Sequence, residues 1–223
     1  MKKGLLITID GPAGSGKSTI SRLLAKNLAY LYLDTGALYR AVAYQVMRNG
    51  IAATDEARVA ELCRRMEIKL HRVDDILKVF VDAQDVTEKI RNEPVGLLAS
   101  TLSAMPVVRS SLLTIQRESG KDGGVIAEGR DMGTVVFPDA DLKFFLDANV
   151  EERARRRYME MIIHGEKVGY QSLKKDLLCR DRQDRERAVA PLKVPDGAIM
   201  VDSTRLSIDA VVKTMLAAIP EQR

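Results

Sequence analysis

The feature that most constrains the fold of this chain is a glycine-rich loop of eight residues, Gly11-Pro12-Ala13-Gly14-Ser15-Gly16-Lys17-Ser18. It matches the pattern G-x-x-x-x-G-K-[ST], and it lies between a buried-strand pattern at residues 4–10 and an apolar helical repeat at residues 18–28. In that setting, glycines let several backbone N–H groups converge on phosphate oxygens, and the helix N-terminus adds its positive end. The loop therefore predicts binding of a nucleoside triphosphate. The alternative is a plain strand-to-helix turn that exposes a lysine.

Two side chains of this loop have separate expected roles. Lys17 is expected to bridge the terminal phosphates, and the hydroxyl of Ser18 to ligate Mg²⁺. The predicted nucleotide site comprises Gly11, Pro12, Ala13, Gly14, Ser15, Gly16, Lys17, Ser18 and Thr19. Two other classes of protein with such loops are disfavoured, because the chain has neither the Asn-Lys-x-Asp motif of GTPases nor the Leu-Ser-Gly-Gly-Gln sequence of transporter ATPases.

Strand and helix patterns alternate along most of the chain, which is typical of βαβ units and a parallel sheet. Short apolar runs predict strands at residues 4–10, 30–33, 125–128, 142–147 and 198–201. Helices are expected at residues 18–28, 37–48, 93–104, 107–119 and 208–219, with further helices starting after N-caps at Thr54 and Asn149. We therefore expect a three-layer α/β fold with a central five-stranded parallel sheet.

Residues 67–85 differ from this pattern. Apolar residues partly alternate with polar ones on both sides of Asp74-Asp75, which predicts an antiparallel hairpin with its turn at those two residues. Such a hairpin does not belong in a parallel sheet, so we interpret it as part of a small insertion.

The composition is that of an ordinary soluble globular protein, and no apolar run approaches the roughly 20 residues that span a membrane. The two cysteines, Cys63 and Cys179, lie far apart in the sequence and have no metal-ligand spacing. A disulfide between them is the less favoured alternative, so a reducing, cytoplasmic location is expected. The net charge of +4 comes from residues 153–187, which hold eleven Lys and Arg against six Asp and Glu. Such a stretch suits a polyanionic ligand and a solvated helix face equally well.

Within this basic stretch, Leu173, Leu177, Arg180, Asp184 and Arg187 follow one another at steps of four and three residues. That spacing places them on one face of a helix. The leucines are expected to face the core, so the same face should turn the three charged residues inward, towards a polar site. The alternative is a set of surface ion pairs, each stabilising the helix by only a few tenths of a kcal/mol.

Arginines also follow two of the predicted strands. Arg40 lies six residues beyond Asp34, and Arg130 and Asp131 follow the strand at residues 125–128. Open parallel sheets bind ligands at the carboxyl ends of their strands, and the fork of an arginine suits a monophosphate. Either arginine alone is ordinarily a surface charge, but the two together beside a phosphate loop indicate a second anion site.

Four segments together resemble bacterial cytidylate kinases: residues 9–18 (IDGPAGSGKS), 34–40 (DTGALYR), 128–138 (EGRDMGTVVFP) and 180–191 (RDRQDRERAVAP). The resemblance covers nearly the whole chain, and the last two segments are much more specific than the phosphate loop. The chain departs from the family pattern at Glu128, where Asp is more common, and at Thr35, where Ser is common. Both residues keep the functional group.

The resemblance implies transfer of the γ-phosphoryl group of MgATP to CMP or dCMP, giving ADP and CDP or dCDP, in pyrimidine metabolism. It implies an acceptor-phosphate clamp of Arg40, Arg130 and Arg187, cytosine readers Thr35, Arg109 and Asp131, and sugar contacts Ser100, Arg180 and Asp184. A carboxylate suits the exocyclic amine of cytosine, whereas uracil presents a carbonyl there. The alternatives are a helix cap for Asp131 and a surface hydroxyl for Ser100.

The resemblance also divides this single unit into a core (residues 1–35 and 106–223), a nucleoside-monophosphate-binding α+β insertion (about 36–105) and a lid (about 153–170). Lid arginines Arg153, Arg156 and Arg157 are expected to close over the transferring group. The expected catalytic residues are Lys17, Arg130, Arg153, Arg157 and Arg187. Asp10 or Glu128 is expected to orient water on the Mg²⁺ held by Ser18, and the chain is expected to be a monomer with no membrane partner.

Three other functions make different demands on these residues. The same chemistry on UMP, AMP or a small alcohol stays open, because cytosine is supported mainly by the resemblance. A non-catalytic nucleotide sensor has no need of a second anion clamp. Nucleic-acid binding by residues 153–187 fits poorly, because the charges there alternate in sign and aromatic residues make up only 4% of the chain.

Overall fold

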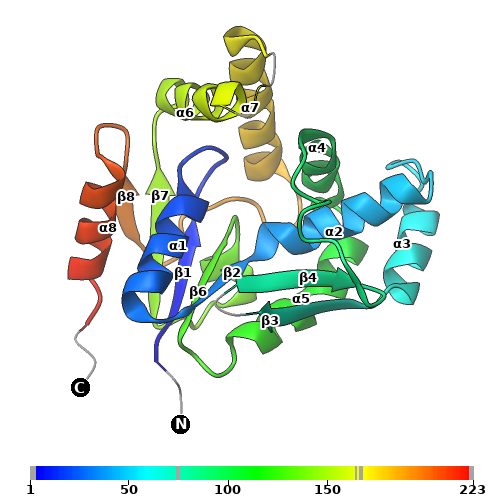
Figure 1. Cartoon of the computed structure of the whole chain (residues 1–223), viewed down its shortest axis with the longest axis horizontal. Helices are drawn as coiled ribbons and strands as arrows, with labels where there is room; N and C mark the ends of the chain where they lie inside the picture. Colours follow the sequence, from blue (N-terminus) through cyan, green and yellow to red (C-terminus); the bar gives the residue numbers. More distant parts are fainter. Residues whose placement is uncertain (1–3, 74–75, 164, 166–167, 221–223) are drawn as a thin grey trace.

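A central sheet of five parallel strands organises the computed structural model, which describes residues 4–73, 76–163, 165 and 168–220 (Figure 1). The strands, in spatial order, are β2 (Leu31–Asp34), β6 (Val125–Gly129), β1 (Leu6–Asp10), β7 (Leu142–Asp147) and β8 (Ile199–Asp202). In register, Asp10 at the end of β1 lies opposite Gly129 of β6 and Phe145 of β7. The predicted parallel sheet is confirmed, and its strands end along one common edge.

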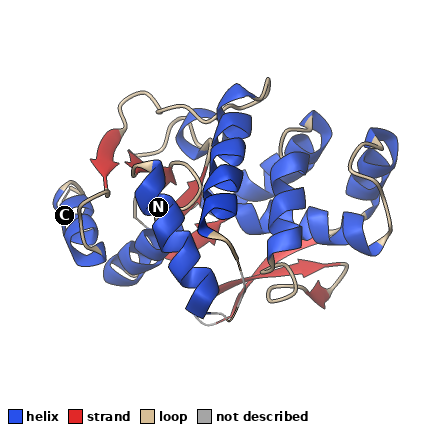
Figure 2. Cartoon of the chain, turned by 90° about the horizontal axis from the view of Figure 1, so that it is seen from above, coloured by secondary structure: helices blue, strands red, loops and turns tan. Residues whose placement is uncertain are grey.

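Helices cover both faces of this sheet, as the view from above shows (Figure 2). Ile7 and Ile126 pack in one cluster with α1 (Lys17–Leu28) and α8 (Ile208–Ala217). Val125, the neighbour of Ile126, packs on the opposite face with α5 (Pro106–Gly120) and a π-helix, η1 (Met132–Val136). Because successive strand residues point to opposite faces, this alternation buries the sheet between two helical layers.

Between β2 and α5 the chain builds a smaller α+β segment. It comprises α2 (Thr35–Arg48), α3 (Glu56–Arg65), β3 (Ile68–Val73), β4 (Ile76–Val81), β5 (Gln84–Asp85) and α4 (Glu93–Leu102). The predicted antiparallel hairpin is confirmed as β3 and β4, and β5 adds a third strand. Its predicted turn at residues 74–75 lies outside the described residues.

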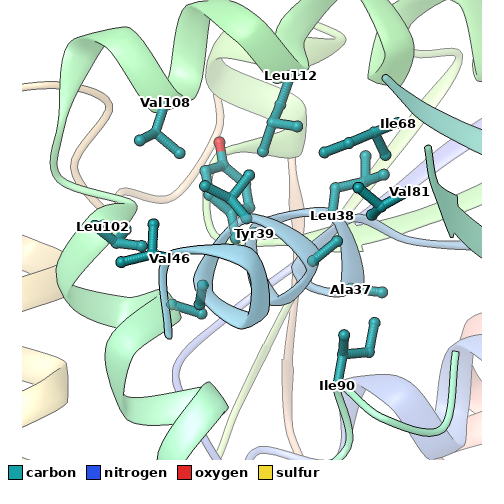
Figure 3. Packing of buried hydrophobic residues seen from close by; sticks show 14 of the residues in the cluster. Ala37, Leu38, Tyr39, Val46, Ile68, Val81, Ile90, Leu102, Val108 and Leu112 are labelled. Atoms are coloured by element: carbon teal, nitrogen blue, oxygen red, sulfur yellow. The ribbon is translucent and has the colours of Figure 1, made fainter. Parts of the chain in front are cut away.

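This segment has its own hydrophobic core, in which Tyr39 and Leu38 of α2 pack near Val81 of β4 (Figure 3). Val108 and Leu112 of α5 belong to the same cluster. Helix α5 therefore contacts the insertion with one side and the sheet with the other. The boundaries of the insertion at residues 36 and 105 stay a prediction.

Of the two predicted helix N-caps, one is wrong and one is confirmed. Helix α3 begins after Asp55, whose carboxylate accepts a backbone N–H at 3.1 Å, so the predicted N-cap at Thr54 is wrong by one residue. Asn149 does cap α6 (Val150–Ile163) by accepting the backbone N–H of Glu152 at 2.8 Å. The Glu152 carboxylate, however, binds two arginines of its own helix and does not complete a capping box.

Helices α6 and α7 (Tyr170–Glu186) pack against each other above the carboxyl ends of the strands (Figure 1). The predicted lid covers most of α6 and the connection to α7, and its residues 164, 166 and 167 lie outside the described part. In the described ranges, no single helix is long and apolar enough to cross a membrane. Only α4 and α5 together, bent by 103°, have the required length and composition.

Candidate active site

The phosphate loop leaves β1 and passes closely over β7. A Cβ at Gly11 would lie 2.0 Å from the backbone carbonyl oxygen of Leu146, so a larger residue would displace backbone. Gly16, with φ of +93°, takes a left-handed conformation just before α1, and no side chain caps the helix. The first N–H groups of α1 are thus left for a ligand, with Ser18 and Thr19 exposed beside them.

Lys17 lies beneath the loop with its side chain buried. Its Nζ donates to the carbonyl oxygen of Pro12 at 2.7 Å, and the Oγ of Ser15 is 3.5 Å away. Burial and, second, the positive charge of Arg130 lower the pKa of Lys17 to about 7. A polyphosphate would supply the negative charge that this buried amine lacks.

Of the two predicted metal partners, only Glu128 lies beside Ser18. The Glu128 carboxylate accepts hydrogen bonds from the hydroxyls of Tyr32 and Ser18, and burial raises its pKa above the ordinary value. Asp10 uses both carboxylate oxygens to accept backbone N–H groups of η1 (Met132–Val136), each at 2.7 Å. Burial raises the pKa of Asp10 to about 6. Asp10 therefore fixes the turn after β6, and the oxygen set at Ser18 and Glu128 is the one that fits Mg²⁺.

A buried cluster of two arginines and a carboxylate follows the end of β6. Arg109 of α5 pairs with Asp131 and donates to the backbone carbonyl of Ser103 at 3.2 Å. The guanidinium of Arg187 lies 3.7 Å from Asp131 and donates to the Ser103 hydroxyl at 3.2 Å. Burial raises the pKa of Asp131, although both arginines oppose the shift. The cluster thus places an acceptor and several donors side by side, and two of the predicted base readers, Arg109 and Asp131, are in contact.

Arg130 and Asp184 form the next contact along the site. The Nε of Arg130 donates to Asp184 at 2.8 Å, and Arg187 lies 3.9 Å from the same carboxylate. Burial opposes the charge of Arg130, but Asp184 raises its pKa above the ordinary value. Because the Asp184 side chain is only 7% exposed and pairs across elements, the surface-pair alternative is wrong for this residue.

Four more of the predicted substrate contacts lie around this cluster. Arg40 packs against α4 and donates to the backbone carbonyls of Ile90 and Asn92, just before that helix, at 3.4 Å each. Arg180 lies 3.6 Å from Glu93, and Ser100 is half-buried on α4. Burial lowers the pKa of both arginines. Thr35 donates to the backbone carbonyl of residue 128 at 2.7 Å, so its hydroxyl is already used by the end of β6.

Two of the three predicted lid arginines hold the phosphate loop from behind. Arg153 is buried, and its guanidinium donates to the carbonyl of Ala13 at 2.9 Å and to Asp181 at 2.6 Å. Arg156 donates to the carbonyl of Ser15 at 3.3 Å. The predicted placement of Arg153 over the transferring group therefore differs from the structure, because acceptors within the protein occupy its donors.

Arg157, the third lid arginine, reaches across to the insertion. It pairs with Glu93 at the start of α4 and with Glu160 of its own helix. Glu93 also faces Arg180 of α7. The Glu93 carboxylate therefore contacts one arginine of α6 and one of α7.

An open cavity of about 730 Å³ lies at the carboxyl ends of β7 and β8. It adjoins the phosphate loop through Ser203, whose hydroxyl is 3.4 Å from the carbonyl oxygen of Ser15. Its lining includes Asp147, Asn149, Met200, Asp202, Arg205 and Leu206. The sequence analysis missed this cavity, because its lining residues come from two separate segments and form no recognisable motif.

Sequence reasoning also missed Asp181, Glu93 and Tyr39. Asp181 lies beside the inward stripe of α7, and only knowledge that α6 packs there would have selected it. Glu93 is an acidic residue in the first turn of a helix, where such residues are common because they interact favourably with the helix dipole, so the sequence gives no sign of a further role. Tyr39 lies against the cluster of Arg109, Asp131 and Arg187, with the guanidinium of Arg109 5.7 Å from its ring centre.

Comparison with known proteins agrees with this geometry. The sequence model of the family described as cytidylate kinase matches residues 7–221. The cytidylate kinase of Citrifermentans bemidjiense is 48% identical over 221 residues, which cover 99% of this chain and 95% of that protein. The cytidylate kinase of Geobacter sulfurreducens is 47% identical with the same coverage.

Solved structures with low sequence identity share the fold. An uncharacterized protein from Eubacterium ventriosum superposes with a TM-score of 0.52 at 11% identity, covering 98% of this chain and 99% of that one. A gluconokinase from Sinorhizobium meliloti gives a TM-score of 0.50 at 16% identity, covering 97% and 92%. The nearly full-length family match and the high identity to curated relatives lead to one assignment: the chain belongs to the cytidylate kinase family.

Proposed function

We propose that this chain transfers the γ-phosphoryl group of ATP, bound with Mg²⁺, to the 5′-phosphate of CMP or dCMP. The products are ADP and CDP or dCDP. The observation that carries the proposal is that two anion sites lie next to each other. Burial and, second, the positive charge of Arg130 lower the pKa of Lys17 in the phosphate loop, and Arg130 pairs with Asp184 on the acceptor side. Two phosphate groups bound at these sites would meet end to end.

The cluster of Arg109, Asp131 and Arg187 favours cytosine as the base of the acceptor nucleotide. The Asp131 carboxylate can accept the exocyclic amine, and Arg109 can donate to the ring nitrogen or the carbonyl. Uracil would place a carbonyl against the carboxylate, which leaves a buried acceptor unpaired and costs binding free energy. Thr35, whose hydroxyl donates to the backbone carbonyl of Glu128, completes the proposed set of base readers.

The acceptor phosphate is held by guanidinium groups. Arg40, Arg130 and Arg187 are the proposed clamp, and Ser100, Arg180 and Asp184 the proposed sugar contacts. Arg187 supports this assignment, because its Nη2 is buried with no hydrogen-bond partner among the residues that the structure describes. A bidentate phosphate would satisfy such a donor.

The donor side holds ATP by its phosphates. Residues 11–19 supply backbone N–H groups and Lys17, and the cavity beside Ser203 would hold the adenosine end. Ser18 would ligate Mg²⁺, with Glu128 as a partner through water. An ion held by these two residues would supply neutralisation of the phosphate charge during transfer.

The chain's own residues align the two nucleotides and stabilise charge. The acceptor oxygen is already anionic, so no strong general base is required. Lys17, Arg130 and Arg187 are the proposed catalytic residues at the junction, and Arg157 joins them when the lid closes and excludes water. Arg153 holds the phosphate loop through its hydrogen bond to the carbonyl of Ala13. A monomer is the proposed working unit.

An ADP-release assay tests the function directly. ATP with Mg²⁺ is incubated with CMP, dCMP, UMP or AMP in turn, and the first two are expected to give the highest kcat/KM. Lys17→Ala is expected to lower kcat by roughly 100-fold or more, by analogy with loss of an oxyanion donor. Equal turnover of all four acceptors, or full activity of the variant, would contradict the proposal.

A further inference from the structure

Arg153 lies in the first turn of α6 and is 4% exposed. Its Nε donates to the carbonyl of Ala148 at 2.8 Å, its Nη1 to the carbonyl of Ala13 at 2.9 Å, and its Nη2 to Asp181 at 2.6 Å. Three protein acceptors therefore fix the guanidinium in one plane. A side chain held in this way is positioned for support and not for contact with a ligand.

The phosphate loop rests directly on this arginine. A Cβ at Gly14 would lie 3.2 Å from the Cβ and from the backbone oxygen of Arg153, which is tighter than ordinary contact, and the φ of +75° at this position also favours glycine. The carbonyl of the preceding residue, Ala13, is the one that accepts from Arg153. Movement of Arg153 would therefore carry the loop with it.

Helix α7 holds the other end of this contact. Asp181 and Asp184 lie three residues apart on its inner side, with side chains 4% and 7% exposed. Asp181 pairs with Arg153 behind the donor loop, whereas Asp184 pairs with Arg130 in the acceptor clamp. Residues three apart share a helix face, so one rigid turn joins the two sites.

We propose that the buried Arg153–Asp181 pair is a positioning device that fixes the distance between the phosphate loop and the acceptor arginines. Neither residue touches a nucleotide. The pair acts through Ala13 on the donor side and through the shared turn of α7 on the acceptor side. This inference rests on the proposed function, because it assigns the pair to the alignment step of that reaction.

Alignment is sensitive to small displacements. A misplacement of about 1 Å between reacting groups costs on the order of 100-fold in rate, while each group can still bind by itself. Loss of the pair should therefore lower kcat and leave the affinity of each nucleotide alone nearly unchanged. A purely structural role would instead lower the melting temperature and both affinities together.

The decisive variant is Asp181→Leu, which removes the acceptor and leaves Arg153 unpaired. We expect kcat to fall by about 10- to 100-fold, with Kd values for a non-hydrolysable ATP analogue and for CMP, each titrated alone, within about threefold of wild type. Asp181→Asn retains an acceptor oxygen and should recover most of the rate. Asp176→Leu, an exposed position on the same helix, is the matched control and should behave as wild type.

The double variant Arg153→Met with Asp181→Leu separates stability from positioning. Replacing a buried ion pair by apolar residues often preserves stability, so the melting temperature should return to that of wild type or above. Arg153→Met also removes the hydrogen bond to Ala13, so kcat should stay low although stability is restored. Recovery of kcat together with the melting temperature would overturn the proposal, as would full activity of Asp181→Leu.

Amide hydrogen exchange provides a readout that does not depend on the acceptor. The loop at residues 11–16 should exchange faster in Asp181→Leu and in the double variant than in wild type, and at the wild-type rate in Asp176→Leu. Unchanged exchange in both pair variants overturns the positioning role. If wild type fails to phosphorylate CMP but the loop exchanges as expected, the proposed function fails while the structural coupling stands.

Discussion

Nucleotide binding should load a proton onto Lys17. Burial and the charge of Arg130 lower its pKa from 10.5 to about 7, so about half of the unliganded molecules carry a neutral amine at pH 7. A triphosphate beside Nζ restores the ammonium. Binding should therefore take up about half a proton at pH 7, nearly one at pH 8 and about a tenth at pH 6.

The lowered pKa of Lys17 also determines how much its burial costs in free energy and over which pH range it affects stability. One pKa unit corresponds to 1.36 kcal/mol, so the lowering from 10.5 to about 7 amounts to roughly 4 to 5 kcal/mol against the charged lysine in the unliganded site. Between pH 7 and 10.5, the unfolded chain holds a proton that the folded chain has lost, so the contribution of Lys17 to stability rises with pH. Below pH 7 both states are protonated, and burial of the charge costs its full amount.

Isothermal titration calorimetry in buffers of different ionisation enthalpy measures this uptake. ATP is titrated, without acceptor, into wild type and Lys17→Met at pH 6, 7 and 8. Proton release from the nucleotide itself is common to both proteins, so the difference between them isolates Lys17. Lys26→Met, in the last turn of the same helix, is the control and should match wild type. A difference of zero between wild type and Lys17→Met at pH 7 and 8 would refute the reasoning.

Three further substitutions test the acceptor side and the lid. Asp131→Asn should narrow the kcat/KM preference for CMP over UMP, because an amide can also donate to the uracil carbonyl; an unaltered ratio removes Asp131 from base reading. Asp184→Ala leaves the half-buried Arg130 without its carboxylate partner, so KM for CMP should rise by roughly tenfold or more at an unchanged fold, as measured by steady-state kinetics and circular dichroism. Glu93→Gln weakens the partly exposed contact between Arg157 and Glu93, which is worth roughly 0.2–1 kcal/mol. Hydrogen exchange of the α6 amides, measured without nucleotide, should therefore rise by no more than about fivefold. The control Glu160→Gln changes only a contact within α6 and should leave the contact between Arg157 and Glu93 in place.

The architecture could be predicted because its signals are local and periodic. The glycine pattern, the apolar runs and the antiparallel alternation at residues 67–85 each report on neighbouring residues, and the structure contains the five strands and the hairpin they indicate. The inner face of α7 was also predictable, because two leucines set its phase before Asp184.

The roles of individual charges were harder to predict, because they depend on contacts between distant segments. Arg153 and Arg157 look equivalent in sequence, yet one is buried against the phosphate loop and the other reaches Glu93. Asp10 and Glu128 both end strands, and only the position of η1 decides which carboxylate stays beside Ser18. The assignments of nucleotide contacts remain predictions that the experiments above address.

The close approach of Gly11 to the backbone of Leu146 has a kinetic consequence. The phosphate loop packs against β7 when the chain folds, so its conformational entropy is already lost before any nucleotide binds. Association with ATP should then be governed by diffusion and lid opening, with no slow ordering step in the cradle itself. A preformed cradle of this kind also makes the off-rate the quantity through which substitutions around it would change affinity.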